Sequence, residues 1–213
     1  MSNSKTVVIA PPNFQTAIFH LEGTAPYVQH KFSSEQRRAM RAKQEQGSTA
    51  KKGKARAAKD FNEVYRQCMY LDPKGQHGMP AAAFRNAMIS ACRIVGFKMT
   101  HAKQCVFIEA DTYDEDGTAL VFIEGTPEPH ESYARNQTGV IDIRLRPMWK
   151  TWRAKLSVRF DADMFTTSDV ANLLSRAGLQ VGIGEGRPDS RESAGMGWGT
   201  FKLLGEREVP ANA

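Results

Sequence analysis

The chain has 213 residues, of which 41% are apolar and 24% are charged, values typical of a soluble globular protein with one domain. No run approaches the roughly 18 apolar residues that a membrane-spanning helix requires, which excludes an integral membrane protein. Cys68, Cys92 and Cys105 are odd in number and widely spaced, which argues against a disulfide framework or a zinc knuckle and favours a reducing, cytoplasmic compartment.

The net charge of +6 is distributed unevenly along the chain. Lys31 to Asp60 contains ten basic and three acidic residues, a local charge of +7, so the rest of the chain sums to −1. A second stretch, Arg144 to Arg159, contains six basic residues and no acid. Two such clusters are typical of a protein that follows a phosphate backbone, although a solvated basic run is the simpler interpretation of either one alone.

The first third of the chain combines one strong strand pattern with a basic segment. Gln15 to Glu22 alternates apolar and polar positions, which predicts a central strand. Its apolar face is formed by Ala17, Phe19 and Leu21. Residues 24–60 have no hydrophobic period after this strand, and we expect a basic insertion there that becomes ordered on an anionic partner.

The middle of the chain predicts a helix and a hairpin. Apolar residues return in 61–71, as a short helix or strand that passes into a turn. Pro80 at a first helical position and Gly96 as a cap bound the clearest helix. Residues 103–110 and 118–124 are apolar runs on either side of the turn DTYDEDG, which predicts a hairpin.

The last third has the most regular pattern. Residues 125–150 form a second insertion or connector that contains an alternating strand over 138–146. Residues 152–160 alternate strictly between apolar and mainly cationic side chains, which predicts a strand with one core face. A helix is predicted from Thr166, with a capping box, to Gly178, and a closing strand over 199–204.

Without the insertions, these elements follow the order βαββαβ. This order predicts an α+β domain over residues 14–205, with a ferredoxin-like or RRM-like antiparallel sheet and both helices on one face. The other face of such a sheet is free to bind, and in RRM modules it holds single-stranded RNA.

The exposed face of the strand 152–160 is the strongest chemical signal. We expect this face to present three cations, Arg153, Lys155 and Arg159, and two residues along an extended strand span about 7 Å. The alternative is an ordinary solvated sheet face. Trp152 is expected to face the core. Trp149 is therefore the candidate platform for stacking a base.

Six glycines between Gly182 and Gly199 predict a loop with a defined conformation. Glycine is favoured where the backbone has a positive φ or lies close to a ligand or another chain segment. The first run resembles a dinucleotide fingerprint, but that motif precedes a helix and this one follows a helix. We therefore expect no nucleotide cofactor. The loop can place backbone N–H groups against phosphate oxygens.

The acidic and histidine residues give no metal or catalytic motif. Asp114 and Asp116 lie in DTYDEDG between apolar runs, without the helices and the later glutamate of an EF-hand, so a hairpin turn is favoured. The histidines form no HxH or HExxH pair. His20 and His30 could act as general acids or bases in an RNA-cleaving relative, but the sequence pairs them with no partner.

Three features together resemble the RAMP superfamily of CRISPR proteins, and within it the repeated backbone subunit that coats guide RNA. GMPAAAFRNAMISACR, at residues 78–93, is similar to the turn, proline and helix after the first RAMP strand. GIGEGRP and GMGWGTFKL, between residues 182 and 204, resemble the glycine-rich loop before the last strand. The basic insertion lies where backbone subunits carry an RNA-contacting extension.

Two departures from this family bear on activity. The RAMP pattern usually has a glycine and a serine near the start of the first helix, where this chain has Ala81 to Ala83. Backbone subunits that cut target RNA use an aspartate soon after the first strand, and the first aspartate here is Asp60. The resemblance therefore implies binding without target cleavage.

We expect a non-enzymatic protein without a cofactor or metal that binds single-stranded RNA, or DNA, and oligomerises along a guide RNA with other effector-complex subunits. The alternatives are a phage single-strand DNA-binding or annealing protein, a RAMP-type endoribonuclease, and a phage assembly component that contacts packaged nucleic acid. No membrane partner is expected. The expected nucleic-acid contacts are Arg37, Arg38, Arg41, Lys51, Lys52, Lys54, Arg144, Arg146, Lys150, Arg153, Lys155, Arg159, Gly182, Gly184 and Arg187.

Overall fold

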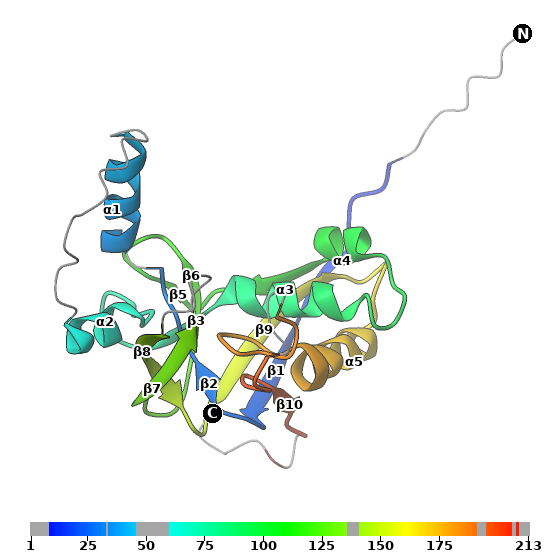
Figure 1. Cartoon of the computed structure of the whole chain (residues 1–213). Coiled ribbons are helices and arrows are strands. Elements are labelled where there is room, and N and C mark those ends of the chain that lie inside the picture. The colour runs from blue at the N-terminus through cyan, green and yellow to red at the C-terminus, as the bar shows by residue number, and fades with distance from the viewer. Residues whose placement is uncertain are drawn as a thin grey trace, which may run out of the picture.

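The computed structural model describes residues 9–32, 34–45, 60–135, 141–190, 195–205 and 208 (Figure 1). It has the expected α+β class with antiparallel sheets. The strands are β1 (Phe14–Gly23), β2 (Tyr27–Val28), β3 (Gly78–Pro80), β4 (Val106–Glu109), β5 (Thr112–Tyr113), β6 (Ala119–Phe122), β7 (Glu128–Arg135), β8 (Ile141–Trp149), β9 (Arg153–Asp161) and β10 (Phe201–Leu203). The helices are α1 (Ser34–Glu45), α2 (Phe61–Gln67), α3 (Ala81–Ala91), α4 (Met99–Cys105) and α5 (Thr167–Arg176). None of these described helices is long and apolar enough to cross a membrane.

The largest sheet has four strands in the order β10-β1-β9-β4, and each strand is antiparallel to its neighbour. Leu21 on β1 lies opposite Ala154 on β9 and Leu203 on β10, so β1 is central. α3 lies in the connection from β1 to β4, and α5 lies in the connection from β9 to β10. Both helices cover the same face of the sheet (Figure 1). The opposite face is called the open face below.

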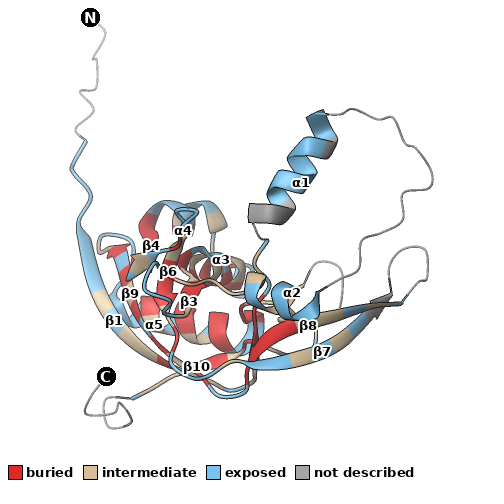
Figure 2. Cartoon of the chain, turned by 90° about the vertical axis from the view of Figure 1, so that its left-hand side faces the viewer, coloured by how far each residue is buried: buried red, intermediate tan, exposed pale blue. Residues whose placement is uncertain are grey.

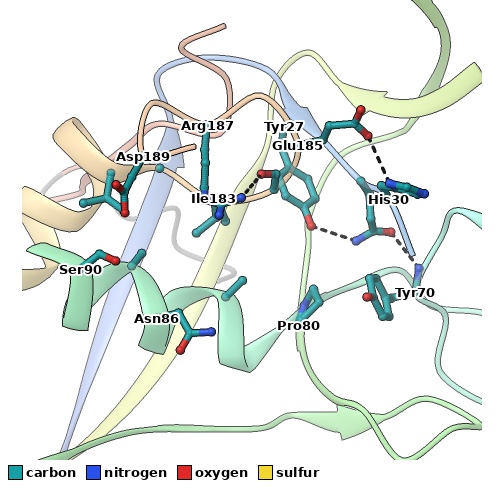
Figure 3. Close-up of a pocket in the computed structure, with 16 residues that line it drawn as sticks. Tyr27, His30, Tyr70, Pro80, Asn86, Ser90, Ile183, Glu185, Arg187 and Asp189 are labelled. Carbon is teal, nitrogen blue, oxygen red and sulfur yellow. Dashed lines mark hydrogen bonds and ion pairs between the residues drawn. The ribbon is translucent and has the colours of Figure 1, made fainter. Parts of the chain in front are cut away.

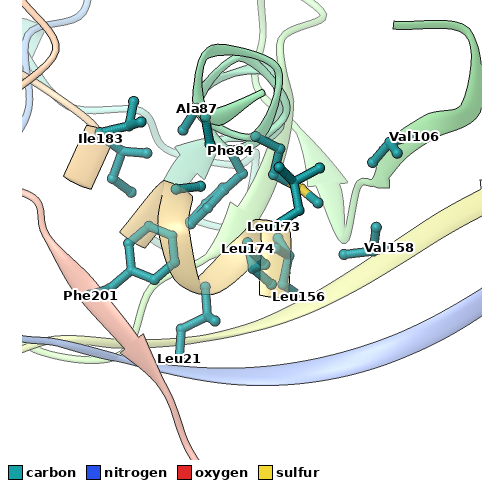
Figure 4. Packing of buried hydrophobic residues seen from close by; sticks show 14 of the residues in the cluster. Leu21, Phe84, Ala87, Val106, Leu156, Val158, Leu173, Leu174, Ile183 and Phe201 are labelled. Atoms are coloured by element: carbon teal, nitrogen blue, oxygen red, sulfur yellow. The ribbon is translucent and has the colours of Figure 1, made fainter. Parts of the chain in front are cut away.

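Alternation along β1 and β9 determines which side chains build the core. Ala154, Leu156, Val158 and Phe160 on β9 are buried, and the residues between them are exposed or half-buried. This confirms the predicted core face and the inward direction of Trp152. The residues that meet between sheet and helices include Leu21, Phe84, Ala87, Leu156, Leu173, Leu174 and Phe201 (Figure 4). Figure 2 shows the same layer as buried residues between the helices and the sheet.

The start of α5 agrees with the prediction, and its end does not. The Thr166 hydroxyl accepts from the Asp169 backbone N–H, and the Asp169 carboxylate accepts from the Thr166 backbone N–H, which completes the capping box. The chain then continues through a π-helical turn, Ala177–Val181, that contains Gly178. A Cβ on Gly178 would lie 2.2 Å from the carbonyl oxygen of Phe201, so this glycine allows close packing and does not end the helix.

The hairpin predicted over 103–124 has the expected turn but a different first strand. Residues 103–105 belong to α4, and β4 pairs with β9 in the four-stranded sheet. The segment DTYDEDG contains β5, and residues 114–118 form the turn to β6; both strands belong to a separate sheet in the order β3-β6-β5. A strand pattern indicates the turn but not the partner of each strand, because it records only the alternation within that strand.

The two segments predicted as insertions pair with each other. β2, from the first, and β8, from the second, form a sheet in the order β2-β8-β7, in which Tyr27 lies opposite Trp149. Both rings are buried, with centroids 5.6 Å apart. Residues 27 and 28 are therefore part of the body of the protein. Trp149 is also unavailable as a stacking platform, so that prediction is wrong.

Candidate nucleic-acid interface

The open face of the four-stranded sheet carries the cations that the β9 pattern predicts. Arg153, Lys155 and Arg159 project on the side away from the buried residues of β9, and Lys155 and Arg159 are exposed. The register places His20 on β1 opposite Lys155 and Thr16 opposite Arg159. Because side chains alternate between faces, these residues share one surface.

An aromatic and arginine cluster lies at one end of this face. The Arg159 guanidinium carbon is 5.1 Å from the ring centroid of Phe14 on β1 and 5.2 Å from that of Phe107 on β4. The two rings meet edge to face with centroids 5.8 Å apart. Phe107 also lies beneath Arg85, whereas Phe14 is 40% exposed and offers the accessible ring. Cations over ring faces are attracted by the ring quadrupole, which holds this cluster together.

Neither phenylalanine was among the residues expected at the interface. Phe14 lies just before the strand predicted over 15–22, but it has the same parity as Thr16 and Ile18 on the polar face, and this parity was a usable signal. Phe107 lies in a segment whose partner strand was predicted wrongly. Its position beside Arg159 depends on the pairing of β4 with β9, which the sequence pattern does not specify.

Arg153 differs from the other two cations because it is engaged by a carboxylate. Its Nη2 and Nε lie 2.7 and 3.1 Å from Oε1 of Glu22, on the neighbouring strand β1. Lys202 on β10 lies 3.3 Å from the other oxygen of Glu22. The hydrogen bond from Arg153, with that from Lys202, lowers the pKa of Glu22. Lys155 and Arg159 have no such carboxylate partner in the described part of the chain.

The second basic cluster of the sequence is divided between several environments. Arg146 is 7% exposed, and its Nε lies 3.0 Å from the Glu185 carboxylate. Arg144 lies 3.6 Å from the same carboxylate, and Lys150 is paired with Glu128 at 2.6 Å. The burial of Arg146 argues against its expected role as a phosphate ligand, because its guanidinium is already paired with the Glu185 carboxylate inside the protein.

The basic insertion contributes one exposed helix. The arginines Arg37, Arg38 and Arg41 lie on α1, which extends away from the sheets in Figure 1. Arg37 pairs with Asp116 in the β5–β6 turn, and Lys31 lies 2.8 Å from the buried Asp114 of that turn. Lys51, Lys52 and Lys54 lie outside the described residues. The acidic turn therefore fixes the start of this insertion to the body of the protein.

The glycine loop lies on the helix side of the sheet, not beside the open face. Gly182 and Gly184 both have positive φ, 70° and 80°. A Cβ on Gly184 would lie 2.6 Å from the carbonyl oxygen of Val28 on β2, so the close approach that needs glycine is to the protein's own chain. Arg187, in the same loop, donates to the carbonyl of Gly184 at 3.1 Å.

His30 lies between an arginine and a carboxylate, a pairing that the sequence did not indicate. Its Nε2 lies 3.3 Å from Nη2 of Arg146, and its Nδ1 lies 3.7 Å from Oε2 of Glu185. Burial, together with the charge of Arg146, lowers the pKa of His30. Both ring nitrogens therefore face protein groups. No group of three or more histidine, cysteine or acidic side chains in the described ranges could hold a metal ion.

Comparison with protein-family models and with curated proteins identifies no relative of this chain. No protein-family model matches the chain, and no match to it is found among curated proteins. The functional argument therefore rests on the residues and on their arrangement.

Proposed function

We propose that the protein binds single-stranded nucleic acid, RNA in preference to DNA, on the open face of its four-stranded sheet. The accessible ring of Phe14 stacks a base, and Lys155 and Arg159 hold phosphates. The observation that carries this proposal is the Phe14, Phe107 and Arg159 cluster on a sheet face with no described helix over it. Single-strand binding proteins combine aromatic platforms with cations that follow the backbone.

We assign the four-stranded sheet to the ferredoxin-like class. The support is the strand order β10-β1-β9-β4 with a helix in each of the two crossover connections, β1 to β4 and β9 to β10. The β2-β8-β7 sheet and α1 are additions to that plan. In RNA-recognition modules of the related plan, the helix-free face binds the strand.

The proposed setting is a CRISPR-type effector complex in which copies of the chain coat a guide RNA. The support is the resemblance of residues 78–93 and of the glycine loop to RAMP proteins, together with the exposed basic helix α1, which lies between β1 and α3 in the chain. The preference for RNA rests on the same resemblance. The three free, buried cysteines are compatible with the reducing cytoplasmic setting that this role requires.

A charge reversal on the open face tests the proposal. The double variant Lys155→Glu and Arg159→Glu is compared with Lys98→Glu and Arg176→Glu, which makes the same charge change on exposed residues of the helix side. Fluorescence anisotropy with a 30-nucleotide RNA at low salt measures affinity. We expect the open-face variant to lose at least tenfold in affinity and to show a weaker salt dependence, because fewer counterions are released.

Equal affinities of the two double variants and the wild-type protein would overturn the proposal. Competition between RNA and DNA of the same sequence then tests the preference for RNA. A tighter complex with DNA would contradict the guide-RNA role and favour the single-strand DNA-binding alternative.

A further inference from the structure

A pocket of about 470 Å³ lies on the helix side of the sheet, away from the open face (Figure 3). α3 forms one wall, and residues 181–189 of the glycine loop form the opposite wall. Residues of β2 and those just after it close one end. The interface proposed above does not use this pocket, so its lining requires an explanation of its own.

The lining of the pocket combines buried apolar side chains with polar groups whose positions are fixed by hydrogen bonds. Ala87 on α3 and Ile183 on the loop are buried where they line it. The ring of Tyr27 closes the end, and its hydroxyl accepts from Nε2 of Gln29 at 3.0 Å. The side-chain oxygen of Gln29 in turn accepts from the backbone N–H of Tyr70 at 2.8 Å. A concave pocket with apolar side chains and a few fixed polar groups is a usual form of a small-molecule site.

Within the described part of the chain, the charges in the lining leave one cation without a counter-ion. Asp189 accepts from Nη2 of Arg93 at 2.9 and 2.7 Å, and Glu185 is engaged by the arginines of β8. Among the described residues, the only hydrogen-bond partner of the Arg187 side chain is the carbonyl of Gly184. A guanidinium with free donors at a pocket is suited to a phosphate.

The rim of the pocket offers polar side chains that no other described side chain or backbone group engages. Asn86 and Ser90 lie one turn apart on α3, so they share a face of that helix. Neither side chain makes a hydrogen bond to another described residue. An amide offers both a donor and an acceptor, and a hydroxyl offers both as well, which suits the edge of a nucleobase.

We infer that this pocket binds a nucleotide unit, with the base between α3 and the glycine loop and its edge against Asn86 and Ser90. The phosphate lies on the guanidinium of Arg187. Two sources supply this chemistry, a free nucleoside monophosphate and a nucleotide within a strand. The site is separate from the open face, so the inference does not rest on the proposed function.

Titration of the full-length protein with AMP, GMP, CMP and UMP, followed by amide NMR, tests the inference. We expect saturable shifts of the amides of Gly182 and Gly184 with at least one nucleotide. Arg187→Gln should weaken binding of that nucleotide at least tenfold, since it removes the charged hydrogen-bond donor to the phosphate. The same variant should bind the corresponding nucleoside, which lacks the phosphate, as the wild-type protein does.

Matched variants separate the pocket from general effects of charge and polarity. Asn86→Ala should weaken nucleotide and nucleoside alike, whereas Asn172→Ala and Arg176→Gln, on exposed positions of α5, should change neither. A 5′-phosphorylated trinucleotide distinguishes the sources: tighter binding than that of the mononucleotide indicates a strand, and equal binding indicates a free nucleotide. Absence of saturable shifts with all four nucleotides, or equal affinity of Arg187→Gln and the wild-type protein, overturns the inference whatever the open face binds.

Discussion

Arg153 and Glu22 face each other across the two central strands, with Nη2 of the arginine 2.7 Å from Oε1 of the carboxylate. The carboxylate of Glu22 is a negative charge on the open face. It is also already bound to Arg153, one of the three cations predicted there. We expect Glu22→Gln to strengthen binding of a 30-nucleotide RNA several-fold at low salt, because it removes a repulsive charge and releases Arg153. Fluorescence anisotropy measures the change.

Glu109→Gln is the matched control for this prediction. Glu109 lies on the same face, opposite Ser157, and is exposed, but it pairs with no cation among the described residues. It should strengthen binding less than Glu22→Gln does. Equal gains from the two variants would mean that Arg153 contributes nothing once it is released.

Substitutions at two glycines of the loop distinguish the cost of an unfavourable backbone conformation from the cost of a steric clash. Gly197 has φ of 74° and no atom within 4 Å of a Cβ, whereas Gly199 has φ of 67° and a Cβ there would lie 1.8 Å from the Ile183 carbonyl oxygen. Gly197→Ala should lower the free energy of unfolding by about 1–2 kcal/mol, the cost of the left-handed region. Gly199→Ala should cost much more or prevent folding. Urea unfolding of both variants checks this, and equal losses would contradict the close packing at Gly199.

The free energy of unfolding should fall with acid because of two histidines that are partly shielded from solvent. Burial lowers the pKa of His30 and of His77 from the ordinary 6.5, so the unfolded chain binds protons more readily than the folded one. This stability is present above pH 6.5 and is lost as pH falls toward the folded-state pKa. We expect His30→Gln to lose less free energy of unfolding than wild type between pH 7 and 5.5. His101→Gln is the control, and a His30→Gln profile parallel to that of wild type would contradict the prediction.

A backbone role predicts that the number of bound copies depends on RNA length. Mass photometry of the protein on RNAs of 30 and 60 nucleotides should show about twice as many copies on the longer RNA, because each copy covers a fixed length of strand. One copy on both RNAs would contradict coating of a guide, although it would leave binding to the open face intact.

The fold could be predicted where the chain has a long periodic pattern. The strict alternation of β9 identified its core face, and the capping box between Thr166 and Asp169 identified the start of α5. β2 was missed because a two-residue strand has no period. Its burial depends on Trp149, which lies more than a hundred residues later in the chain. Local pattern therefore identifies elements better than it identifies their partners.

In the candidate site, too, the positions along one strand could be predicted, but the partners across strands could not. Parity along one strand predicted that Lys155 and Arg159 share a face, and the structure agrees. The pairing of Arg153 with Glu22 and the stacking of Arg159 on Phe14 and Phe107 depend on the register between three strands. No local pattern specifies that register, so the sequence predicted an unbroken row of cations.

The most direct test of the central claim is ultraviolet cross-linking of the protein to a uridine-rich RNA, with the linked peptides identified by mass spectrometry. Stacking on the accessible ring predicts cross-links at Phe14 on β1, and it predicts that Phe14→Leu removes them while the protein remains folded. Cross-links confined to α1 or to the helix side, with none on β1, β4 or β9, would contradict the assignment of the open face as the nucleic-acid interface.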